Sequence, residues 1–323
     1  MNTKVNSLYR KHRPKKFSDV IGQEHVTKTL TNQILKKNIA HAYLFCGTRG
    51  CGKTTVAKIF AHAVNDLEYN NANNNMDIFE IDAASNNGVD SVRELIEKVK
   101  YPPVNSKYKV YIIDEVHMFS TSAFNALLKT LEEPPSYVIF ILATTEPHKL
   151  PPTVLSRCLR FDFRSASVSQ ISELLKKTFN KENIKYTEDA VLLLAIAGQG
   201  SFRDALSLSE TVASFSDNNI TEQSVNQVIG SVDKNLLEKL LTSIKEKNLK
   251  SIKVIVDEVF SVGRNINSVI KDFLTVVKTH YMRSQDTKTM SIYQKFAELE
   301  LSIKTATDAQ HAFEGCCLLA TII

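Results

Sequence analysis

The chain has 323 residues, which at about 100 to 200 residues per domain gives two or three domains and excludes a peptide or a single small module. Its 43% of hydrophobic and 23% of charged residues are typical of a globular protein and exclude a disordered or fibrous one. The net charge of +5 is uneven, because residues 1–60 hold 12 Lys and Arg against 2 Asp and Glu, while the rest hold 28 against 33. A solvated basic face and a polyanion partner explain this bias equally well.

No apolar run approaches the roughly 18 residues of a membrane span, so we expect no membrane partner. The basic N-terminus, MNTKVNSLYRKHRPKK, lacks the apolar core of a secretory signal, which predicts a cytoplasmic protein. None of the five cysteines forms the CxxC pairs that zinc or redox centres use, and reduced thiols are expected for all of them: Cys46, Cys51, Cys158, Cys316 and Cys317.

In the first half of the chain, short apolar runs alternate with helical periodicity, which predicts an α/β domain with a parallel sheet and crossover helices. A helix is expected after Gly88, and another from about Ser120 must end at Pro134 and Pro135. Four runs are apolar almost throughout, as central strands buried on both faces are: 42–46, 78–81, 110–113 and 138–143.

Beyond about Phe163, amphipathic helical patterns replace the strand patterns as far as the C-terminus, so this part is expected to be all-α. The change predicts an α/β domain over residues 1–163, a small helical domain over 164–229 and a second helical domain over 230–323. The segment 65–75, NDLEYNNANNN, is expected to be a polar loop because it is of low complexity.

The phosphate-loop pattern GxxxxGK[ST] occurs between an apolar strand and a helical segment, the context that it requires. Its glycines let the backbone wrap around a phosphate, so that N–H groups and the positive end of the helix face one anion. Lys53 then reaches the β- and γ-phosphates, and the Thr54 hydroxyl ligates Mg²⁺. The nucleotide-binding residues expected here are Gly47, Thr48, Arg49, Gly50, Cys51, Gly52, Lys53 and Thr54.

A second acidic strand end is expected to complete this site. The apolar run VYII leads into Asp114 and Glu115, which point in different directions because they are adjacent at a strand end. We expect Asp114 to hold the hydrated Mg²⁺ and Glu115 to orient and deprotonate the attacking water. Taken alone, such a pair is more often a helix cap or a turn, but the phosphate loop requires a metal ligand.

Together, these motifs resemble the gamma/tau subunits of bacterial DNA polymerase III, the AAA+ ATPases of the sliding-clamp loader. The resemblance covers essentially the whole chain, and its most specific segments are HAYLFCGTRGCGKTT, KVYIIDEVHMFSTSAFNALLKTLEEPP, LPPTVLSRC and GSFRDAL. It implies an AAA+ P-loop domain, a helical lid and a helical collar that joins subunits. It also implies an ATPase in DNA replication that belongs to the polymerase holoenzyme without carrying the polymerase active site.

The resemblance gives roles to residues that would otherwise be taken for ordinary surface side chains. Arg157 becomes an arginine finger that acts in trans in the ATP site of the next subunit, Arg203 a second sensor in the lid, and Thr145 the sensor of the γ-phosphate. Packing against adenine is implied for Arg13, Pro14 and Val20. The implied cofactors are ATP and Mg²⁺. The implied partners are other gamma/tau copies, the delta and delta prime subunits, the beta sliding clamp and primed DNA.

Contacts with DNA phosphates are expected at the N-terminal ends of the helices after Gly88 and Phe119. The hydroxyl groups there are explained equally well as helix caps. The candidate residues are Arg93, Ser120, Thr121 and Ser122.

Two features depart from the family pattern. Members commonly carry a four-cysteine zinc module after the phosphate-loop helix, where this chain has the Asn-rich segment 65–75, so we expect no zinc site. The chain also ends at Ile323, where the collar pattern ends, without the extension of the longer tau form. A gamma-like product and a shortened chain are both consistent with this length.

Two alternatives share part of the pattern. A branch-migration helicase has the phosphate loop and the acidic strand end, but the helical last third leaves no place for its winged-helix domain. A catalytically inactive scaffold similar to delta prime keeps the fold and commonly degrades the ATP site. The residues that such a scaffold loses are intact here: Lys53, Thr54, Asp114 and Glu115.

Overall fold

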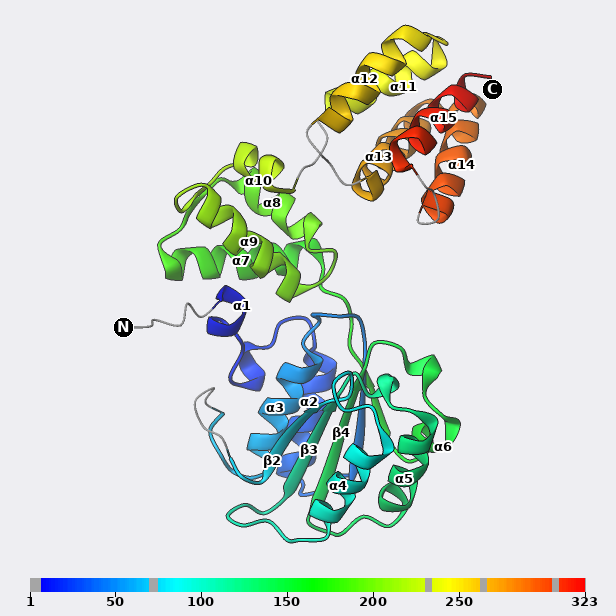
Figure 1. Ribbon diagram of the computed structural model, residues 1–323. Coiled ribbons are helices and arrows are strands. Elements are labelled where there is room, and N and C mark those ends of the chain that lie inside the picture. Colours follow the sequence, from blue (N-terminus) through cyan, green and yellow to red (C-terminus); the bar gives the residue numbers. More distant parts are fainter. Residues whose placement is uncertain (1–6, 70–74, 230–233, 262–265, 304–307, 323) are drawn as a thin grey trace. The chain divides into compact units, whose positions relative to one another are not determined.

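The computed structural model describes residues 7–69, 75–229, 234–261, 266–303 and 308–322 (Figure 1). The chain divides into two compact units, Met1–Thr221 and Glu222–Ile323. The predicted division into three domains, with boundaries after residues 163 and 229, stays a prediction. None of the described helices is both long enough and apolar enough to cross a membrane.

The first unit contains a parallel sheet of five strands in the order β2-β3-β4-β1-β5 (Figure 1). The three inner strands are buried at nearly every position, which confirms the prediction made from their continuous apolar runs. The strands are β1 (Ala42–Cys46), β2 (Ile78–Asp82), β3 (Lys109–Asp114), β4 (Val138–Thr144) and β5 (Leu159–Asp162).

The two edge strands differ from the sequence prediction. The run 78–81 was expected to form a central strand, but β2 lies at one edge and its residues are partly exposed. Strand β5 is not predicted, because it buries only Phe161 and therefore has no apolar run. A pair of two-residue strands, β6 (Lys185–Tyr186) and β7 (Asn219–Ile220), also forms in the part that was predicted to be all-α.

Helices cover both faces of the sheet, because successive strand side chains point to opposite faces. Tyr43 and Phe45 of β1 pack with one pair of helices, and Leu44 packs with the other pair. The helices expected after Gly88 and from Ser120 are confirmed. The first pair is α2 (Glu24–Leu35) and α3 (Lys53–Ala63), and the second pair is α4 (Val89–Val99) and α5 (Thr121–Glu132) (Figure 1).

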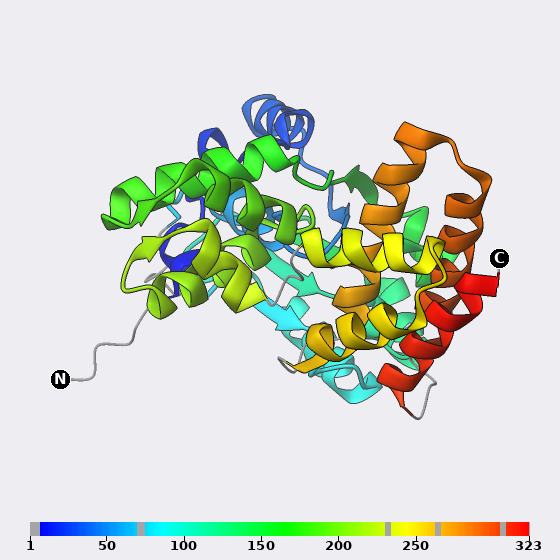
Figure 2. The same ribbon diagram turned by 90° about the horizontal axis from the view of Figure 1, so that it is seen from above.

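The N-terminal helix α1 packs against a helical part of the first unit that lies some 170 to 200 residues further along the chain (Figure 1, Figure 2). The Leu8 amide donates a hydrogen bond of 3.1 Å to Glu210 Oε2, and Lys11 and His12 both contact the Glu182 carboxylate. The helices are α1 (Leu8–Lys11), α7 (Val168–Glu182), α8 (Glu188–Ala197) and α9 (Phe202–Phe215).

Among its described residues, the second unit contains only helices and the short connections between them. Its core is built around Phe273, Phe296 and Phe313, whose rings meet edge to face with centroids 4.6 to 6.4 Å apart. Its helices are α10 (Glu222–Ile229), α11 (Lys234–Lys245), α12 (Leu249–Ser261), α13 (Ile266–Ser284), α14 (Thr287–Ser302) and α15 (Ala309–Ile322).

Candidate nucleotide-binding site

The phosphate loop connects β1 to α3 and has a backbone that only glycine adopts easily. Gly50 and Gly52 have φ angles of +73° and +108°, in the left-handed region. At Gly50, a side chain is also excluded by Ser201, whose Oγ would lie 1.9 Å from an added Cβ. Gly52 is the N-cap of α3, so the loop ends at the positive end of that helix. This arrangement suits an anion such as a phosphate.

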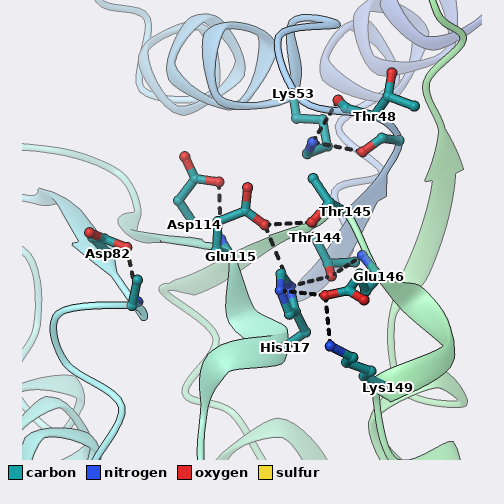
Figure 3. A network of polar contacts seen from close by, with 12 residues as sticks. Thr48, Lys53, Asp82, Asp114, Glu115, His117, Thr144, Thr145, Glu146 and Lys149 are labelled. Carbon is teal, nitrogen blue, oxygen red and sulfur yellow. Dashed lines mark hydrogen bonds and ion pairs between the residues drawn. The ribbon is translucent and has the colours of Figure 1, made fainter. Parts of the chain in front are cut away.

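Lys53 folds back into the loop that precedes it. Its side chain is buried, and Nζ donates hydrogen bonds of 2.8 Å to the Gly47 carbonyl and 3.0 Å to the Thr48 carbonyl (Figure 3). These two carbonyls satisfy the ammonium group, which would otherwise be costly to bury. The loop therefore holds a positive charge at the place where the motif predicts phosphate.

Thr54 and Asp114 bring the phosphate loop together with the acidic end of β3. The Thr54 hydroxyl donates a hydrogen bond of 2.7 Å to Asp114 Oδ2. Hydroxyl and carboxylate oxygens are ligands that suit Mg²⁺, which is often held in proteins by one or two side chains together with phosphates. The two residues therefore fit the metal that the sequence predicts. In the described part of the chain, this site included, no group of three or more His, Cys, Asp or Glu side chains could hold a metal ion.

Glu115 points away from Asp114, toward the end of β4. Its backbone has φ +49° and ψ +44°, a left-handed conformation that is uncommon outside glycine and that turns the chain sharply after the strand. The Thr145 hydroxyl donates a hydrogen bond of 3.0 Å to Glu115 Oε2 (Figure 3). Two residues that the sequence assigned to catalysis therefore lie in contact.

A histidine whose side chain is largely shielded from solvent lies beside this pair and was missed by the sequence analysis. His117 Nδ1 lies 3.0 Å from Thr144 Oγ1 and 3.4 Å from Glu115 Oε2, and Nε2 lies 3.1 Å from Glu146 Oε2 (Figure 3). A hydrogen bond from Lys149 contributes most to lowering the pKa of Glu146, so this carboxylate is charged at neutral pH. The signal for His117 was its place two residues after the acidic pair, but Thr144 and Glu146 reach it from the end of another strand.

Arg203 lies at the start of α9, which is tied to the phosphate loop. The amide of Phe202 donates a hydrogen bond of 3.2 Å to the Gly50 carbonyl. The Arg203 guanidinium carbon lies 4.9 Å from the centre of the Tyr9 ring, in cation–π contact. The first turn of α9 and the N-terminal helix α1 therefore meet next to the loop.

The N-terminal segment also approaches the helix that follows the phosphate loop. Arg13 Nε donates a hydrogen bond of 2.9 Å to Thr55 Oγ1 in the first turn of α3. Val20 is partly buried against the sheet core that α2 and α3 share, and Pro14 is half-buried. The structure thus brings Arg13 to the predicted site, and the adenine contacts stay a prediction.

Arg157 contacts α5 and α6 (Pro152–Leu155) of its own chain. It forms an ion pair of 2.5 Å with Glu132 and donates a hydrogen bond of 2.6 Å to the Thr153 carbonyl. Its side chain is about one-third exposed. Arg157 is thus held at the surface of the sheet domain.

The predicted DNA contacts lie at two helix N-termini that are joined to each other. The Ser120 amide donates a hydrogen bond of 3.1 Å to the Asn87 carbonyl, just before α4. Ser120 is the N-cap of α5, since its hydroxyl accepts from the Ala123 amide at 3.2 Å. The hydroxyl oxygens of Ser120 and Ser122 lie 3.0 Å apart, and Thr121 is exposed. Arg93 forms an ion pair with Asp90. For Ser120, the capping alternative is thus observed.

The Asn-rich segment is only partly described, since residues 70–74 lie outside the described residues. Its first residue, Asn65, is buried and makes three hydrogen bonds, with the Ala61 carbonyl and with both backbone groups of Tyr108. Asn65 lies in a turn outside the helices and strands, as predicted for this segment, but its buried side chain also connects the end of the phosphate-loop helix to the segment before β3.

All five cysteines are free thiols, as the sequence predicted. Burial raises the pKa of Cys158 and of Cys316 to about 12 and raises that of Cys51 in the phosphate loop, so these thiols stay protonated at neutral pH. Cys51 thus has a packing role in the loop.

Two family models match the first unit. A model described as "DNA polymerase III, delta subunit" matches residues 22–167, and one described as "DNA polymerase III clamp loader subunit, ATPase lid domain" matches residues 170–218. The second match begins within α7 and includes Phe202, whose amide bonds the Gly50 carbonyl of the phosphate loop.

Curated relatives cover most of the chain. DNA polymerase III subunit tau of Bacillus subtilis is 46% identical over 282 residues, which are 83% of this chain and 50% of the relative. DNA polymerase III subunit gamma of Buchnera aphidicola subsp. Baizongia pistaciae is 36% identical over 287 residues, which are 84% of this chain and 77% of the relative. The chain therefore spans about half the length of the tau relative.

A solved structure shares the fold. The Thermotoga maritima RuvB Holliday junction branch migration motor superimposes with a TM-score of 0.55 over 81% of this chain and 90% of its own, at 19% sequence identity. This likeness shows that the two chains share a fold. Given the matched relatives, the chain belongs to the gamma/tau family of bacterial DNA polymerase III, the AAA+ subunits of the clamp loader.

Proposed function

We propose that this chain is an ATPase motor subunit of a DNA polymerase III clamp loader, which uses ATP to load the sliding clamp onto primed DNA. The observation that carries the proposal is the set of contacts at the carboxyl ends of the strands, where the phosphate loop meets Asp114 and the end of β4, and Thr145 meets Glu115. Lys53 lies in the loop, Thr54 bonds Asp114, and Thr145 bonds Glu115. The family model of the lid domain supports the same reading of α7 to α9.

Each side chain has a task in hydrolysis. When ATP binds, Lys53 Nζ leaves the two loop carbonyls and contacts the β- and γ-phosphates, which carry full negative charge. Thr54 and Asp114 would hold Mg²⁺, which supplies positive charge to the phosphate oxygens. Glu115 orients the attacking water and accepts its proton. The Thr145 hydroxyl donates its hydrogen bond to Glu115 here, and it would donate to the γ-phosphate when ATP is bound.

The two arginines make hydrolysis depend on assembly. Arg157, at the surface of the sheet domain, leaves its ion pair with Glu132 and contacts the ATP of a neighbouring subunit. There it stabilises the negative charge of the transition state. Arginine fingers contribute about 10³ to 10⁵ in rate in well-studied phosphoryl-transfer enzymes. Arg203 reads the phosphate from the lid of the same chain, since α9 is tied to the loop through Phe202 and Gly50.

Loss of the γ-phosphate removes the charge that both arginines contact, so it loosens the interface between subunits. An assembly that is tight with ATP and loose after hydrolysis is able to hold an open clamp and release it on DNA. The proposed partners are other gamma/tau copies, the delta and delta prime subunits, the beta sliding clamp and primed DNA. The proposed DNA contacts are Arg93, Ser120, Thr121 and Ser122.

A catalytically inactive scaffold is the second candidate, and the match of residues 22–167 to a delta-subunit model favours it. The contacts of Lys53, Thr54 and Asp114 oppose it, because a scaffold has no need of an ordered phosphate and metal site. Binding of a fluorescent ATP analogue with Mg²⁺ separates the two. The ATPase proposal expects saturable binding that Lys53→Ala abolishes, while absence of binding by the unaltered chain would establish the scaffold.

A further inference from the structure

A histidine that the mechanism above does not use lies between the two strand ends of the site. His117 belongs to the short 3-10 turn Val116–Met118 that follows Glu115, and its side chain is only 7% exposed. Both ring nitrogens face polar atoms, from Glu115 on its own segment and from Thr144 and Glu146 at the end of β4 (Figure 3). Packing alone does not require a polar ring at such a place.

The ring is held in one orientation by the residues at the end of β4. The Thr144 hydroxyl accepts a hydrogen bond of 3.0 Å from the Glu146 amide, which fixes the oxygen that lies 3.0 Å from His117 Nδ1. On the other side of the ring, Nε2 lies 3.1 Å from Glu146 Oε2, and Lys149 holds the same oxygen at 2.9 Å. Thr144, the last residue of β4, and Glu146, two residues later, therefore each lie within 3.1 Å of one ring nitrogen.

The edge of the ring lies against the carboxylate that activates water. His117 Nδ1 is 3.4 Å from Glu115 Oε2, the oxygen that also accepts the Thr145 hydroxyl. Glu115 needs such support, because its side chain is about one-third exposed and its backbone is in an uncommon conformation. When Thr145 leaves Glu115 for the γ-phosphate, the imidazole is the neighbour that keeps the carboxylate in place.

We propose that His117 is a positioning residue for Glu115, oriented in turn by Thr144 and Glu146. The proposal rests on the proposed function, since it assumes that Glu115 activates water for ATP hydrolysis. The arrangement follows the general pattern in which a catalytic base is held by a second group and that group by a third. It predicts that His117 affects the rate of the chemical step and leaves nucleotide binding unchanged.

The test measures kcat and KM for ATP in the loader assembled with its clamp and primed DNA. His117→Ala is expected to lower kcat about 10- to 100-fold, the cost typical of losing a residue that orients a functional side chain, and to change KM less than about twofold. His117→Asn places an amide nitrogen near the position of Nδ1 and is expected to recover part of the loss. Glu146→Gln keeps the shape of the orienting residue and is expected to lower kcat with KM unchanged.

The matched control is His148→Ala, because His148 is also a neighbour of Glu146, at 3.9 Å, but is 74% exposed. It should leave kcat unchanged. In a background of Glu115→Gln, His117→Ala should cause no further loss, since the two residues act on one step. Additive losses of kcat in the double variant would overturn the positioning role. So would a rise in KM and a loss of thermal stability that are equal in both His117 variants. If unaltered protein binds ATP but hydrolyses none in the assembled loader, the proposed function itself fails.

Discussion

The hydroxyl of Thr54, in the first turn of α3, donates a hydrogen bond of 2.7 Å to Oδ2 of Asp114, the last residue of β3. Sixty residues separate them in the chain. They meet because parallel strands present their carboxyl ends at one edge of the sheet, where the phosphate loop also begins. The contact joins the residue that ends the phosphate-loop motif to the one that begins the acidic pair.

The first prediction concerns this contact. Asp114→Asn keeps a hydrogen-bond acceptor for Thr54 but removes the charge that a divalent cation requires. We expect ATP to bind without Mg²⁺ as in the unaltered protein, while the gain in affinity on adding Mg²⁺ disappears and hydrolysis falls by at least about 100-fold. A titration of nucleotide affinity against Mg²⁺ measures this. An unchanged response to Mg²⁺ would show that Asp114 holds no metal.

The second prediction concerns Lys53. Because its ammonium group is buried in the loop and would face the phosphates directly, Lys53→Ala should abolish nucleotide binding. Equilibrium dialysis with ATP and Mg²⁺ measures the loss. Lys58→Ala is the matched control, because Lys58 lies in the same helix and pairs with Glu80 on the edge strand β2. Retained affinity in the Lys53 variant would contradict the phosphate-loop assignment.

The third prediction concerns Arg157. Arg157→Ala should spare ATP binding and lower turnover by about 10³-fold or more, since its partner is the transition state in a neighbouring subunit. Measurements of Kd and of kcat in the assembled loader separate the two effects. Arg160→Ala, which removes a half-exposed arginine paired with Asp162 nearby, should change neither. Equal loss of binding in the Lys53 and Arg157 variants would count against action in trans.

The fourth prediction concerns the stability of the first unit. Asp77 is fully buried, and its carboxylate accepts hydrogen bonds of 2.7, 2.9 and 3.0 Å from the amides of Val104, Asn105 and Ser106. Burial alone would raise the pKa of Asp77, but these bonds together lower it below its ordinary value. A lowered pKa stabilises the fold at neutral pH, and this contribution is lost as the pH falls through the folded-state pKa.

Asp77→Asn should therefore lower the free energy of unfolding at pH 7 by about 1 to 3 kcal/mol, because an amide cannot accept from all three donors. Thermal unfolding between pH 7 and pH 3 checks this, and the difference from the unaltered protein should shrink toward the acid end. Asp66→Asn, which removes an exposed carboxylate paired with Lys107, is expected to have little effect. A constant difference at every pH would rule out the charge as its cause.

The inner strands and the site motifs were predictable because each is local. Strand β1 begins and ends at the predicted residues, since five consecutive buried apolar residues leave little choice. The edge strand β5 carries one buried residue, Phe161, and no local pattern reveals it. Its place follows only from pairing with β1.

The histidine at the centre of the site was missed for a similar reason. His117 follows Glu115 by two positions, yet its role depends on Thr144 and Glu146, which reach it because β4 lies beside β3. Strand order is a property of the tertiary fold. Asn65 is the converse case, since its polar, low-complexity surroundings gave no sign of a buried side chain with three hydrogen bonds.

The central claim is that neighbouring subunits share one ATP, so the most direct measurement is the ATPase rate of the chain by itself and in the loader with clamp and primed DNA. The account predicts slow hydrolysis by the isolated chain, a large increase on assembly, and loss of that increase in Arg157→Ala. Rapid hydrolysis by the isolated chain that neither assembly nor DNA changes would contradict it.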